Sequence, residues 1–408
     1  MTSLPHLLAR TYHRIPQGVH LGLERVLVAT EQLGHPERSW PSLHIAGTNG
    51  KGSVAATTSL ALARAGYRVG LFTSPHLQRF AERIRINQEP IGDSLLASAL
   101  EQALKFDLTF FELTFIASLI AFRESDVDCA VFEVGMGGRL DATNILEAPV
   151  ATAVTRIALD HTQSLGNTLD AIAHEKACIA KARCPMVLGN MDETARETIR
   201  RVAITRGAAP VWNAEQTPWG SLTFCTSLAG QHQQDNARVA AAVCCCAASK
   251  LDRLTLAHVQ DAVASVSWPG RLESIYRNGT EFLLDGAHNP DAVEALAKHL
   301  EDRRIDPTKT VLVFGVMQDK AWPSMLDRLD PVASQRIYVA PKGRAPALTS
   351  ELAERLPGIQ ASSVKDALAQ AADNTTQGGV VVVCGSLFLV AEARAVLLGQ
   401  EMDTVVAM

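Results

Sequence analysis

Short apolar runs alternate with amphipathic stretches from residue 42 to about residue 154. This alternation is typical of strand–helix–strand units, and it predicts an α/β domain with a mainly parallel sheet and helices on both faces. The expected strands are residues 43–46, 68–73, 129–134 and 151–155. The expected helices are residues 53–65, 94–105, 112–123 and 169–182.

The pattern breaks near Trp268-Pro269-Gly270-Arg271, and a second series of strands and helices starts after Asn278-Gly279. Its expected strands are residues 282–285, 311–314, 336–339 and 380–383. Proline and glycine at the break favour a domain boundary. We therefore expect an N-terminal domain of residues 1–271, a linker of residues 272–280, and a smaller, Rossmann-like α/β domain of residues 281–408.

The composition narrows the class of protein. Of the 408 residues, 47% are apolar and 20% are charged, and the formal net charge is −5, as in a soluble globular protein. Lysine and arginine are scattered, which argues against a nucleic-acid partner, and no apolar run is long enough to span a membrane. Residues 1–10 lack the apolar core of a secretory signal, so we expect a cytoplasmic protein whose partners are small molecules.

The eight cysteines include no C-x-x-C pair. Cys244-Cys245-Cys246 lie in an alanine-rich segment with a helical pattern, where neighbouring side chains point in different directions. We interpret the cysteines as small buried apolar residues, and we do not expect a zinc site.

A glycine-rich segment follows the first expected strand and leads directly into a helical pattern. It consists of Gly47, Thr48, Asn49, Gly50, Lys51, Gly52 and Ser53. Glycines let backbone N–H groups turn toward an anion, and the positive end of the helix dipole points to the same place. Lys51 can neutralise phosphate oxygens, and Ser53 offers a hydroxyl group to phosphate or metal. The segment therefore predicts a P-loop-type phosphate site and a reaction driven by ATP.

Two related motifs test this interpretation. The usual Walker A spacing fails twice, at Ile45 and at Gly52. Gly50-x-Gly52-x-x-Ala55 does fit the dinucleotide fingerprint, but residues 68–73 end without the acidic residue that would hold a ribose hydroxyl. A nicotinamide site and a purely structural glycine turn remain as alternatives.

Other polar sequences follow the remaining strands of the first domain. Ser74-Pro75-His76, Gly135–Gly138 and Asp160-His161 come at or shortly after strand ends, where parallel sheets bind ligands. Glu133 ends an apolar strand, where a carboxylate needs a cation such as magnesium bound to ATP. The alternative for Glu133 is a salt bridge to a nearby arginine such as Arg139. From chemistry alone His161 is a phosphate contact, because imidazole is not a preferred magnesium ligand.

Together these motifs resemble one family, the folylpolyglutamate synthase and dihydrofolate synthase enzymes within the Mur ligase group. The matching segments cover most of the chain. They are GTNGKGS (47–53), TSPHL (73–77), EVGMGGRLDATN (133–144), ALDHT (158–162), EKACIAK (175–181), GQHQQDN (230–236), PGR (269–271) and DGAHNP (285–290). Gln88 and Cys178 depart from the family pattern, since relatives commonly have glycine at these places. The segment before residues 21–25 matches only loosely.

The resemblance implies roles for particular residues. Ser74, Glu133 and His161 are expected to hold Mg²⁺, and Lys176 is expected to be carbamylated and, with Lys51 and His288, to be catalytic. Asn236 is the expected adenine contact, with a helix cap or a surface amide as its alternative. Arg271 and Asp285 are expected to contact ATP, and His288 and Ser386 to hold glutamate. The alternatives are a helix cap for His288 and a strand-end turn for Asp285.

The resemblance also places a pteroate site in three segments. These are His13, Arg14, Ile15 and Pro16; Thr109, Phe110, Phe111 and Glu112; and Leu140, Asp141 and Ala142. Phe110 and Phe111 can stack on a flat ring, although an aromatic pair at a helix start also fits a core position.

The expected function is therefore an ATP- and Mg²⁺-dependent amide ligase. The acceptor carboxylate attacks the γ-phosphoryl group of ATP, and the amino group of glutamate then attacks the acyl phosphate. The expected acceptors are dihydropteroate, a folate that already carries glutamate, or both, with the two domains closing over the nucleotide to exclude water. A monomer is implied by the resemblance. Another Mur-type ligase and a nucleotide-gated binding protein are the alternatives.

Overall fold

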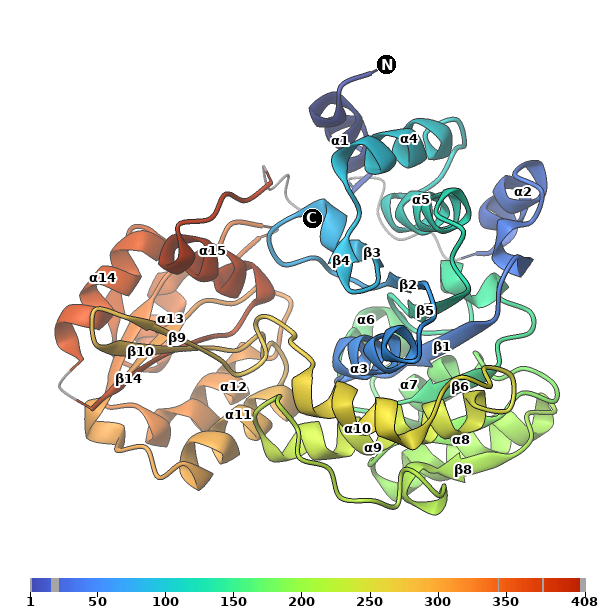
Figure 1. Ribbon diagram of the computed structural model, residues 1–408. Helices are drawn as coiled ribbons and strands as arrows, with labels where there is room; N and C mark the ends of the chain where they lie inside the picture. The colour runs from blue at the N-terminus through green and yellow to red at the C-terminus, as the bar shows by residue number, and fades with distance from the viewer. Residues whose placement is uncertain (1, 16–21, 344, 376–377, 404–408) are drawn as a thin grey trace. The chain divides into compact units, whose positions relative to one another are not determined.

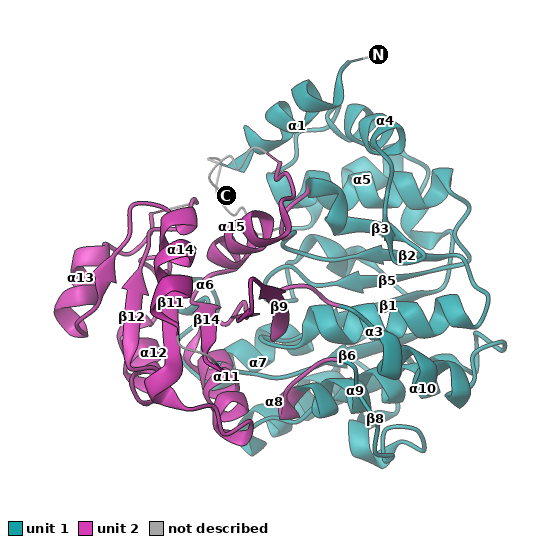
Figure 2. Cartoon of the chain, turned by 60° about the vertical axis from the view of Figure 1, so that its left-hand side comes forward, with its two compact units in different colours: residues 1–76, 80–227, 233–267 teal, residues 77–79, 228–232, 268–408 magenta. Residues whose placement is uncertain are grey.

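The computed structural model describes residues 2–15, 22–343, 345–375 and 378–403. The chain forms two compact units, coloured separately in Figure 2. Unit 1 comprises Met1–His76, Phe80–Ser227 and Gln233–Ser267, and unit 2 comprises Leu77–Arg79, Leu228–His232 and Trp268–Met408. Two short internal segments therefore pack with the C-terminal unit.

Unit 1 is built on an eight-stranded sheet with the order β4-β3-β2-β5-β1-β6-β7-β8 (Figure 1). The strands are β1 (Ser42–Ala46), β2 (Val69–Phe72), β3 (Ile84–Ile86), β4 (Glu89–Pro90), β5 (Cys129–Glu133), β6 (Ala151–Val154), β7 (Met186–Leu188) and β8 (Val211–Asn213). Strands β2, β5, β1, β6, β7 and β8 are parallel, while β3 and β4 add an antiparallel edge. The predicted parallel sheet is confirmed, but the four outer strands β3, β4, β7 and β8 were not predicted.

Helices cover both faces of this sheet. They are α1 (Leu4–Tyr12), α2 (Glu24–Gln32), α3 (Lys51–Arg64), α4 (Asp93–Ala103), α5 (Phe110–Glu124), α6 (Thr162–Leu165), α7 (Leu169–Ala177), α8 (Glu193–Thr205), α9 (Gln231–Ala247) and α10 (Leu256–Ser265). Short 3₁₀ turns include η3 (Phe80–Arg83) and η4 (Ala142–Ile145). Phe72 of β2 and Phe132 of β5 pack against Phe115 of α5, while α3 packs on β1, β2 and β5 and against α10.

Unit 2 contains a six-stranded sheet with the order β13-β12-β11-β14-β10-β9. Its strands are β9 (Glu273–Arg277), β10 (Thr280–Leu284), β11 (Thr310–Phe314), β12 (Gln335–Tyr338), β13 (Ile359–Gln360) and β14 (Val380–Cys384). All pair in parallel except β9, which is antiparallel to β10. Residues 272–280, expected as a linker, therefore form β9 and a hairpin turn at Asn278-Gly279. Neither β9 nor this hairpin was predicted.

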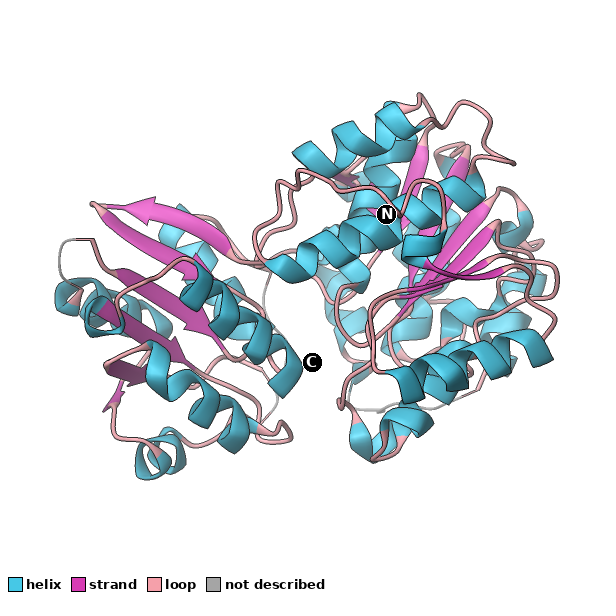
Figure 3. Cartoon of the chain, turned by 90° about the horizontal axis from the view of Figure 1, so that it is seen from below, coloured by secondary structure: helices cyan, strands magenta, loops and turns pink. Residues whose placement is uncertain are grey.

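The helices of unit 2 lie on both faces of its sheet (Figure 3). They are α11 (Pro290–Asp302), α12 (Trp322–Leu329), α13 (Thr349–Arg355), α14 (Val364–Asn374) and α15 (Leu387–Leu398). Alternate strand residues enter two separate cores. Leu283, Leu312 and Val382 pack with α11, α12 and α13, whereas Leu284, Val313 and Val383 pack with α14 and α15. Burial on both faces explains the continuous apolar runs of these strands.

Several expected helix bounds differ from the structure. Helix α7 ends at Ala177 instead of continuing to residue 182, and α3 begins at Lys51 instead of Ser53. Helix α4 ends at Ala103 instead of residue 105, and α5 begins at Phe110 instead of residue 112. Among the cysteines, five are buried as expected, but Cys225 is exposed. Within the described residues, no helix is long and apolar enough to cross a membrane.

Candidate active site

The phosphate loop connects β1 to α3, and its backbone lies against other parts of unit 1. Gly47 and Gly50 have φ values of 149° and 89°, a region that side chains with a Cβ rarely adopt. A Cβ at Gly47 would lie 1.9 Å from Thr155 Oγ1, and one at Gly50 would lie 2.2 Å from Asn236 Oδ1. Both glycines are therefore required by conformation and by space.

Hydrogen bonds hold the loop to the segment after β6. The Thr48 N–H donates to Arg156 O over 2.6 Å, and Thr155 Oγ1 donates to Asn49 O over 2.6 Å. Lys51 Nζ donates to Thr48 O over 3.1 Å, so the ammonium group lies over the loop. Ser53 is buried in the first turn of α3. The loop thus presents a cation and a helix N-terminus in a fixed conformation, as phosphate binding requires.

Asn236 reaches the loop from α9. Its Nδ2 donates to Oε1 of the buried Gln233 over 2.9 Å, and its Oδ1 lies beside Gly50. Asn236 lies inside α9, not at an end of it, so the helix-cap alternative is wrong. The structure thus brings the predicted adenine contact next to the predicted phosphate loop.

Glu133 is a buried carboxylate at the end of β5. Its Oε2 accepts a hydrogen bond from the Ser74 N–H over 3.1 Å, so two of the predicted metal ligands are neighbours. The alternative for Glu133 was a salt bridge to a nearby arginine; Arg139, the example given, pairs instead with Glu175 over 2.9 Å. Arg83 is also buried, and the negative charge of Glu133 acts on its guanidinium group. Burial lowers the pKa of this group to about 10, and the charge of Glu133 opposes that shift.

The donor set around Glu133 suits a hard cation that shares its ligands with phosphate. One carboxylate and one serine hydroxyl are oxygen donors of the kind that Mg²⁺ prefers. Within the described ranges, no group of three or more His, Cys, Asp and Glu side chains is arranged to hold a metal ion. Mg²⁺ commonly completes its shell with waters and with phosphate oxygens of a substrate. The third predicted ligand, His161, is exposed at the start of α6 with a φ of 50°.

Lys176 is buried near the C-terminal end of α7. Burial lowers the pKa of its amine to about 7, the positive charge of Lys51 lowers it further, and Asp160 and Asp141 oppose the shift. A substantial fraction of the amine is therefore neutral at neutral pH and able to react as a nucleophile. The Gly135–Gly138 loop presses on this helix, since a Cβ at Gly138 would lie 2.6 Å from Glu175 O.

The predicted pteroate residues of α5 divide into two groups. Thr109 and Glu112 form a capping box: the Glu112 N–H donates to Thr109 Oγ1, and the Thr109 N–H donates to Glu112 Oε2 over 2.8 Å. Arg25 donates to both Glu112 oxygens over 3.0 and 2.7 Å. These side chains therefore fix the start of α5, and their polar atoms are engaged within the protein.

The two phenylalanines are only partly buried. Phe110 stacks on Tyr12 with ring centroids 5.7 Å apart, and the Arg83 guanidinium carbon lies 5.0 Å from the Phe110 centroid. Phe111 lies against Gly135 and Phe72. Arg83 Nε also donates to Nδ1 of His76 over 2.7 Å, and lost hydration together with Arg83 lowers the pKa of His76. An aromatic and cationic cluster thus surrounds Phe110.

The third predicted pteroate segment is organised by Asp141. Its buried carboxylate accepts from the Met136 and Thr143 N–H groups over 2.9 and 3.0 Å and from Thr143 Oγ1. Because that hydroxyl donates to Asp141, it accepts from Nε2 of His44, 2.8 Å away in β1. Burial, helped by Lys181, lowers the pKa of His44 to about 3. Asp141 therefore shapes the loop, while Leu140 is partly exposed and Ala142 is buried.

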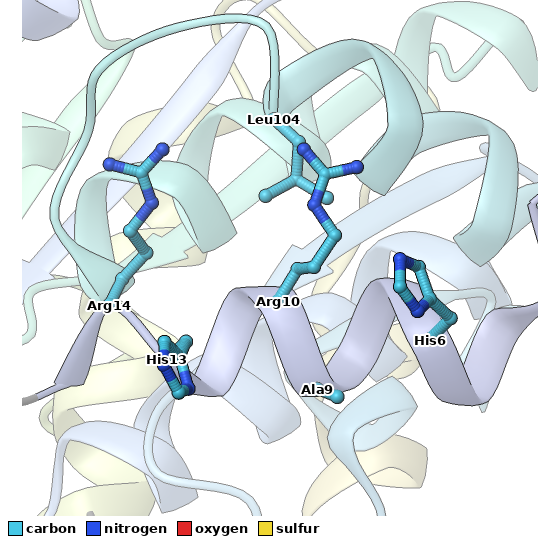
Figure 4. A pocket seen from close by; sticks show the side chains of 6 residues that line it. All are labelled: His6, Ala9, Arg10, His13, Arg14 and Leu104. Carbon is cyan, nitrogen blue, oxygen red and sulfur yellow. The ribbon is translucent and has the colours of Figure 1, made fainter.

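The remaining segment that was predicted to bind pteroate, residues 13–16, follows the end of α1. His13 and Arg14 line an open cavity, shown in Figure 4, and Ile15 is buried. Pro16 lies outside the described residues.

In unit 2 the predicted residues cluster where β10 and β14 end. Asp285 is buried and accepts from the Leu272 and Ala287 N–H groups over 2.8 and 2.9 Å, which supports its alternative as a turn residue. Arg271 Nη1 would lie 3.2 Å from a Cβ at Gly286, so Arg271 lies beside the turn that Asp285 forms.

The two residues that were predicted to bind glutamate, His288 and Ser386, lie in neighbouring loops. The Gly385 N–H donates to Ala287 O over 2.9 Å, which joins the loop of His288 to that of Ser386. His288 Nδ1 contacts Gly286 O at 2.7 Å, and α11 is capped by Asn289, so the cap alternative for His288 is wrong. Ser386 is buried and caps α15 by accepting from the Phe388 N–H.

Sequence reasoning missed Arg83, Arg25 and His44 as parts of this site. Their partners lie 7, 87 and 99 residues away along the chain. The capping box of α5 was the one accessible signal, because Thr109-x-x-Glu112 precedes an apolar run.

Comparison with known proteins identifies the family. Residues 270–387 match the Mur ligase, glutamate ligase domain model. The dihydrofolate synthase/folylpolyglutamate synthase of Bacillus subtilis is 37% identical over 78% of this chain and 81% of that protein. The chain belongs to the dihydrofolate synthase/folylpolyglutamate synthase family. The Escherichia coli protein of this name is 34% identical over 93% of this chain and 92% of its own length.

Solved structures of this family share the fold over the whole chain. The Escherichia coli structure in complex with DHPP and ADP has a TM-score of 0.86 and 30% identity, and it covers 98% of both chains. The Yersinia pestis structure complexed with AMPPNP and Mn ion has a TM-score of 0.84 and 30% identity, also over 98% of both chains.

The first prediction concerns Gly50. We expect Gly50→Ala to weaken ADP and ATP binding about fivefold or more, because relieving a Cβ clash with Asn236 costs about 1–3 kcal/mol. Gly66→Ala is the control: its φ is 82°, but its nearest atom is 3.8 Å away. Isothermal titration with nucleotide measures both variants. Equal nucleotide affinity of Gly50→Ala and Gly66→Ala would show that the lack of a Cβ at Gly50 is not needed for nucleotide binding.

The second prediction concerns His44. A histidine whose pKa is about 3 when folded and 6.5 when unfolded stabilises the fold less as pH falls from 6.5 toward 3. We expect His44→Gln to reduce the slope of unfolding free energy against pH by up to about 1.4 kcal/mol per unit. Urea unfolding between pH 7 and 4 measures it, with the exposed His174→Gln as control. Identical slopes for wild type and His44→Gln would refute the prediction.

Proposed function

We propose that this protein is an ATP-dependent ligase that adds L-glutamate to dihydropteroate and to folates that already carry glutamate. The observation that carries the proposal is the phosphate loop, whose glycines lie against Thr155 and Asn236, in a chain that belongs to a family of glutamate ligases. Relatives solved with ADP and with AMPPNP support the use of ATP.

The reaction has two steps. The acceptor carboxylate attacks the γ-phosphorus of ATP, and the bond from this phosphorus to the β,γ-bridging oxygen breaks. ADP is released, and the acceptor becomes an acyl phosphate. The amino group of glutamate then attacks the acyl carbon, loses a proton and releases phosphate. Lys51, the loop N–H groups and the start of α3 bind the phosphate oxygens as their charge is redistributed.

We infer that Ser74, Glu133 and His161 hold Mg²⁺ together with ATP oxygens. When bound, the ion neutralises phosphate charge. A neutral Lys176 amine reacts with carbon dioxide to give a carbamate and a proton, and the negative charge of the carbamate is then stabilised by the positive charge of Lys51. Asn236, Arg271 and Asp285 bind the nucleotide, and His288 and Ser386 bind glutamate.

The pteroate group is assigned to the three segments near α1, α5 and η4. The partly buried faces of Phe110 and Phe111 stack on its ring, and His13, Arg14, Leu140 and Ala142 contact the rest. Thr109, Glu112 and Asp141 act by holding their segments in place, since their polar atoms bond within the protein. We also infer a cytoplasmic, monomeric protein.

A product assay tests the function. The purified chain is supplied with ATP, Mg²⁺, L-glutamate and either dihydropteroate or a folate monoglutamate. We expect ADP and a product heavier by one glutamyl unit with each acceptor. ADP formed only with another amino acid or a muramyl peptide would favour a different Mur-type ligase, and tight ATP binding without turnover would favour a nucleotide-gated binding protein.

Replacement of Glu133 tests the metal assignment. Glu133→Gln keeps an oxygen that accepts from the Ser74 N–H but removes the charge that a cation needs. We expect acceptor-dependent ADP release to fall at least about a hundredfold. The control Glu197→Gln removes a charge from an exposed position on α8. Full activity of Glu133→Gln over a range of Mg²⁺ concentrations would refute the assignment.

A further inference from the structure

Arg271, in unit 2, lies between two residues whose backbones adopt the left-handed region. Gly270 has a φ of 74° and Leu272 has a φ of 47°. Leu272 is buried, and a residue with a large side chain keeps such a φ only where its surroundings hold it there. The backbone around the predicted nucleotide arginine is therefore held by specific contacts.

Hydrogen bonds fix both peptide units that flank Arg271. Gly270 O accepts from the Gly286 N–H over 2.8 Å, and the Leu272 N–H donates to Asp285 Oδ2 over 2.8 Å. Because each peptide unit is planar, one hydrogen bond on each unit restrains the planes on both sides of the Arg271 Cα. These bonds thereby set the direction in which the Arg271 side chain leaves the backbone.

A third contact to this segment comes from Glu273, at the start of β9. Its Oε2 accepts from the Gly270 N–H over 2.8 Å. A Cβ at Gly270 would lie 3.1 Å from Val390 Cγ1, so the backbone here also packs against α15. The Glu273 carboxylate thus holds the residue directly before Arg271.

Glu273 is in turn held by Arg394 of α15. Arg394 Nε donates to both Glu273 oxygens over 3.0 and 3.1 Å, and the two side chains are only 16% and 22% exposed. Arg394 Nη1 donates to Gln400 Oε1 over 3.0 Å and to Oε1 of the buried Gln78. Because these partners restrain the guanidinium group, the ion pair loses less side-chain freedom than an exposed pair does. All of these residues belong to unit 2.

A neighbouring ion pair shows what is particular to this one. Glu281 of β10 accepts from Arg303 over 2.9 and 2.9 Å and from Ser274 Oγ over 2.7 Å. These contacts join side chains of two strands and of the residue after α11. The Glu273 carboxylate instead binds a backbone N–H next to Arg271. Of the two pairs, Glu273–Arg394 is the one that bears on the orientation of that arginine.

We propose that Glu273 and Arg394 are positioning residues of the nucleotide site, which hold the Gly270 backbone and thereby orient the Arg271 guanidinium group toward a phosphate of ATP. The inference rests on the proposed function only in its assignment of Arg271 to the nucleotide. A guanidinium group binds phosphate through paired hydrogen bonds that depend on direction as well as charge. An Arg271 that has turned away therefore loses affinity although its charge remains.

Calorimetric titration with ADP tests the inference. We expect the Kd for ADP to rise about fivefold in Glu273→Gln and in Arg394→Gln, and no further in the double variant, because both changes release the same backbone segment. In an Arg271→Ala background, Glu273→Gln should change the Kd by less than about twofold, because the side chain that it positions is absent. A general loss of stability would not depend on the side chain at position 271.

Glu281→Gln is the matched control, because it breaks an ion pair of the same kind on the neighbouring strand, and its Kd should equal that of wild type. Arg394→Lys keeps the positive charge without the planar fork, and we expect a Kd between those of wild type and Arg394→Gln. Thermal unfolding of every variant confirms that the titrated protein is folded.

Three results would overturn the inference: an unchanged Kd in Glu273→Gln and Arg394→Gln, an equal rise in the Arg271→Ala background, or an equal rise in Glu281→Gln. Failure of the proposed function gives a different result. In that case wild type forms no glutamyl product with any acceptor, while the pattern of ADP affinities among the variants still decides whether Glu273 and Arg394 position Arg271.

Discussion

The close approach of glycine backbone to neighbouring segments is the constraint on which the N-terminal unit depends. At Gly50 and Gly138 there is no room for a Cβ, because Asn236 and the backbone of α7 occupy the space. The loop between β1 and α3 is thereby held between β6 and α9, and the Gly135–Gly138 loop is held against α7. Backbone N–H groups can then face an anion without rearrangement, which is how a preorganised site stabilises developing charge.

This tight packing buries charged groups beside the loop. Glu133, Arg83 and Lys176 all lie inside unit 1, where an unpaired charge is costly. Glu133 and Arg83 offset each other in part, whereas Lys176 responds by a lowered pKa that makes its amine reactive. Loss of hydration on burial thus changes the chemistry of Lys176 most clearly, because part of its amine is neutral near pH 7.

Helix α1 combines a buried side with exposed basic side chains. Its buried residues include Tyr12, which stacks on Phe110 near Arg83, and its exposed residues include His6 and Arg10. At the ends of β10 and β14 in unit 2, the Asp285 carboxylate holds a turn and the Ser386 hydroxyl caps α15. Several residues that were predicted to bind ligands therefore also fix the local backbone.

The strongest local patterns were enough to predict the core of both sheets. Apolar runs such as residues 129–134 and 380–383 identify strands that are buried on both faces, and the glycine-rich segment identifies the phosphate loop. Weak or short strands were missed: β4 and β9 are edge strands, β3 lies between β4 and β2, and all three have antiparallel partners and little apolar periodicity. For this reason β9 was not recognised within the expected linker of residues 272–280.

The sequence by itself determined which residue types are available at the ends of the strands, because strand ends, glycines and capping patterns are local properties. Only the tertiary structure decided what those residues contact. In the structure Glu112 pairs with Arg25 and Arg139 pairs with Glu175. Asp141 accepts a hydrogen bond from the Thr143 N–H, and Asn236 lies beside Gly50. Such partners are selected by packing between segments far apart in the chain, and the loss of hydration that shifts the pKa of Lys176 and of His44 exists only after that packing has formed.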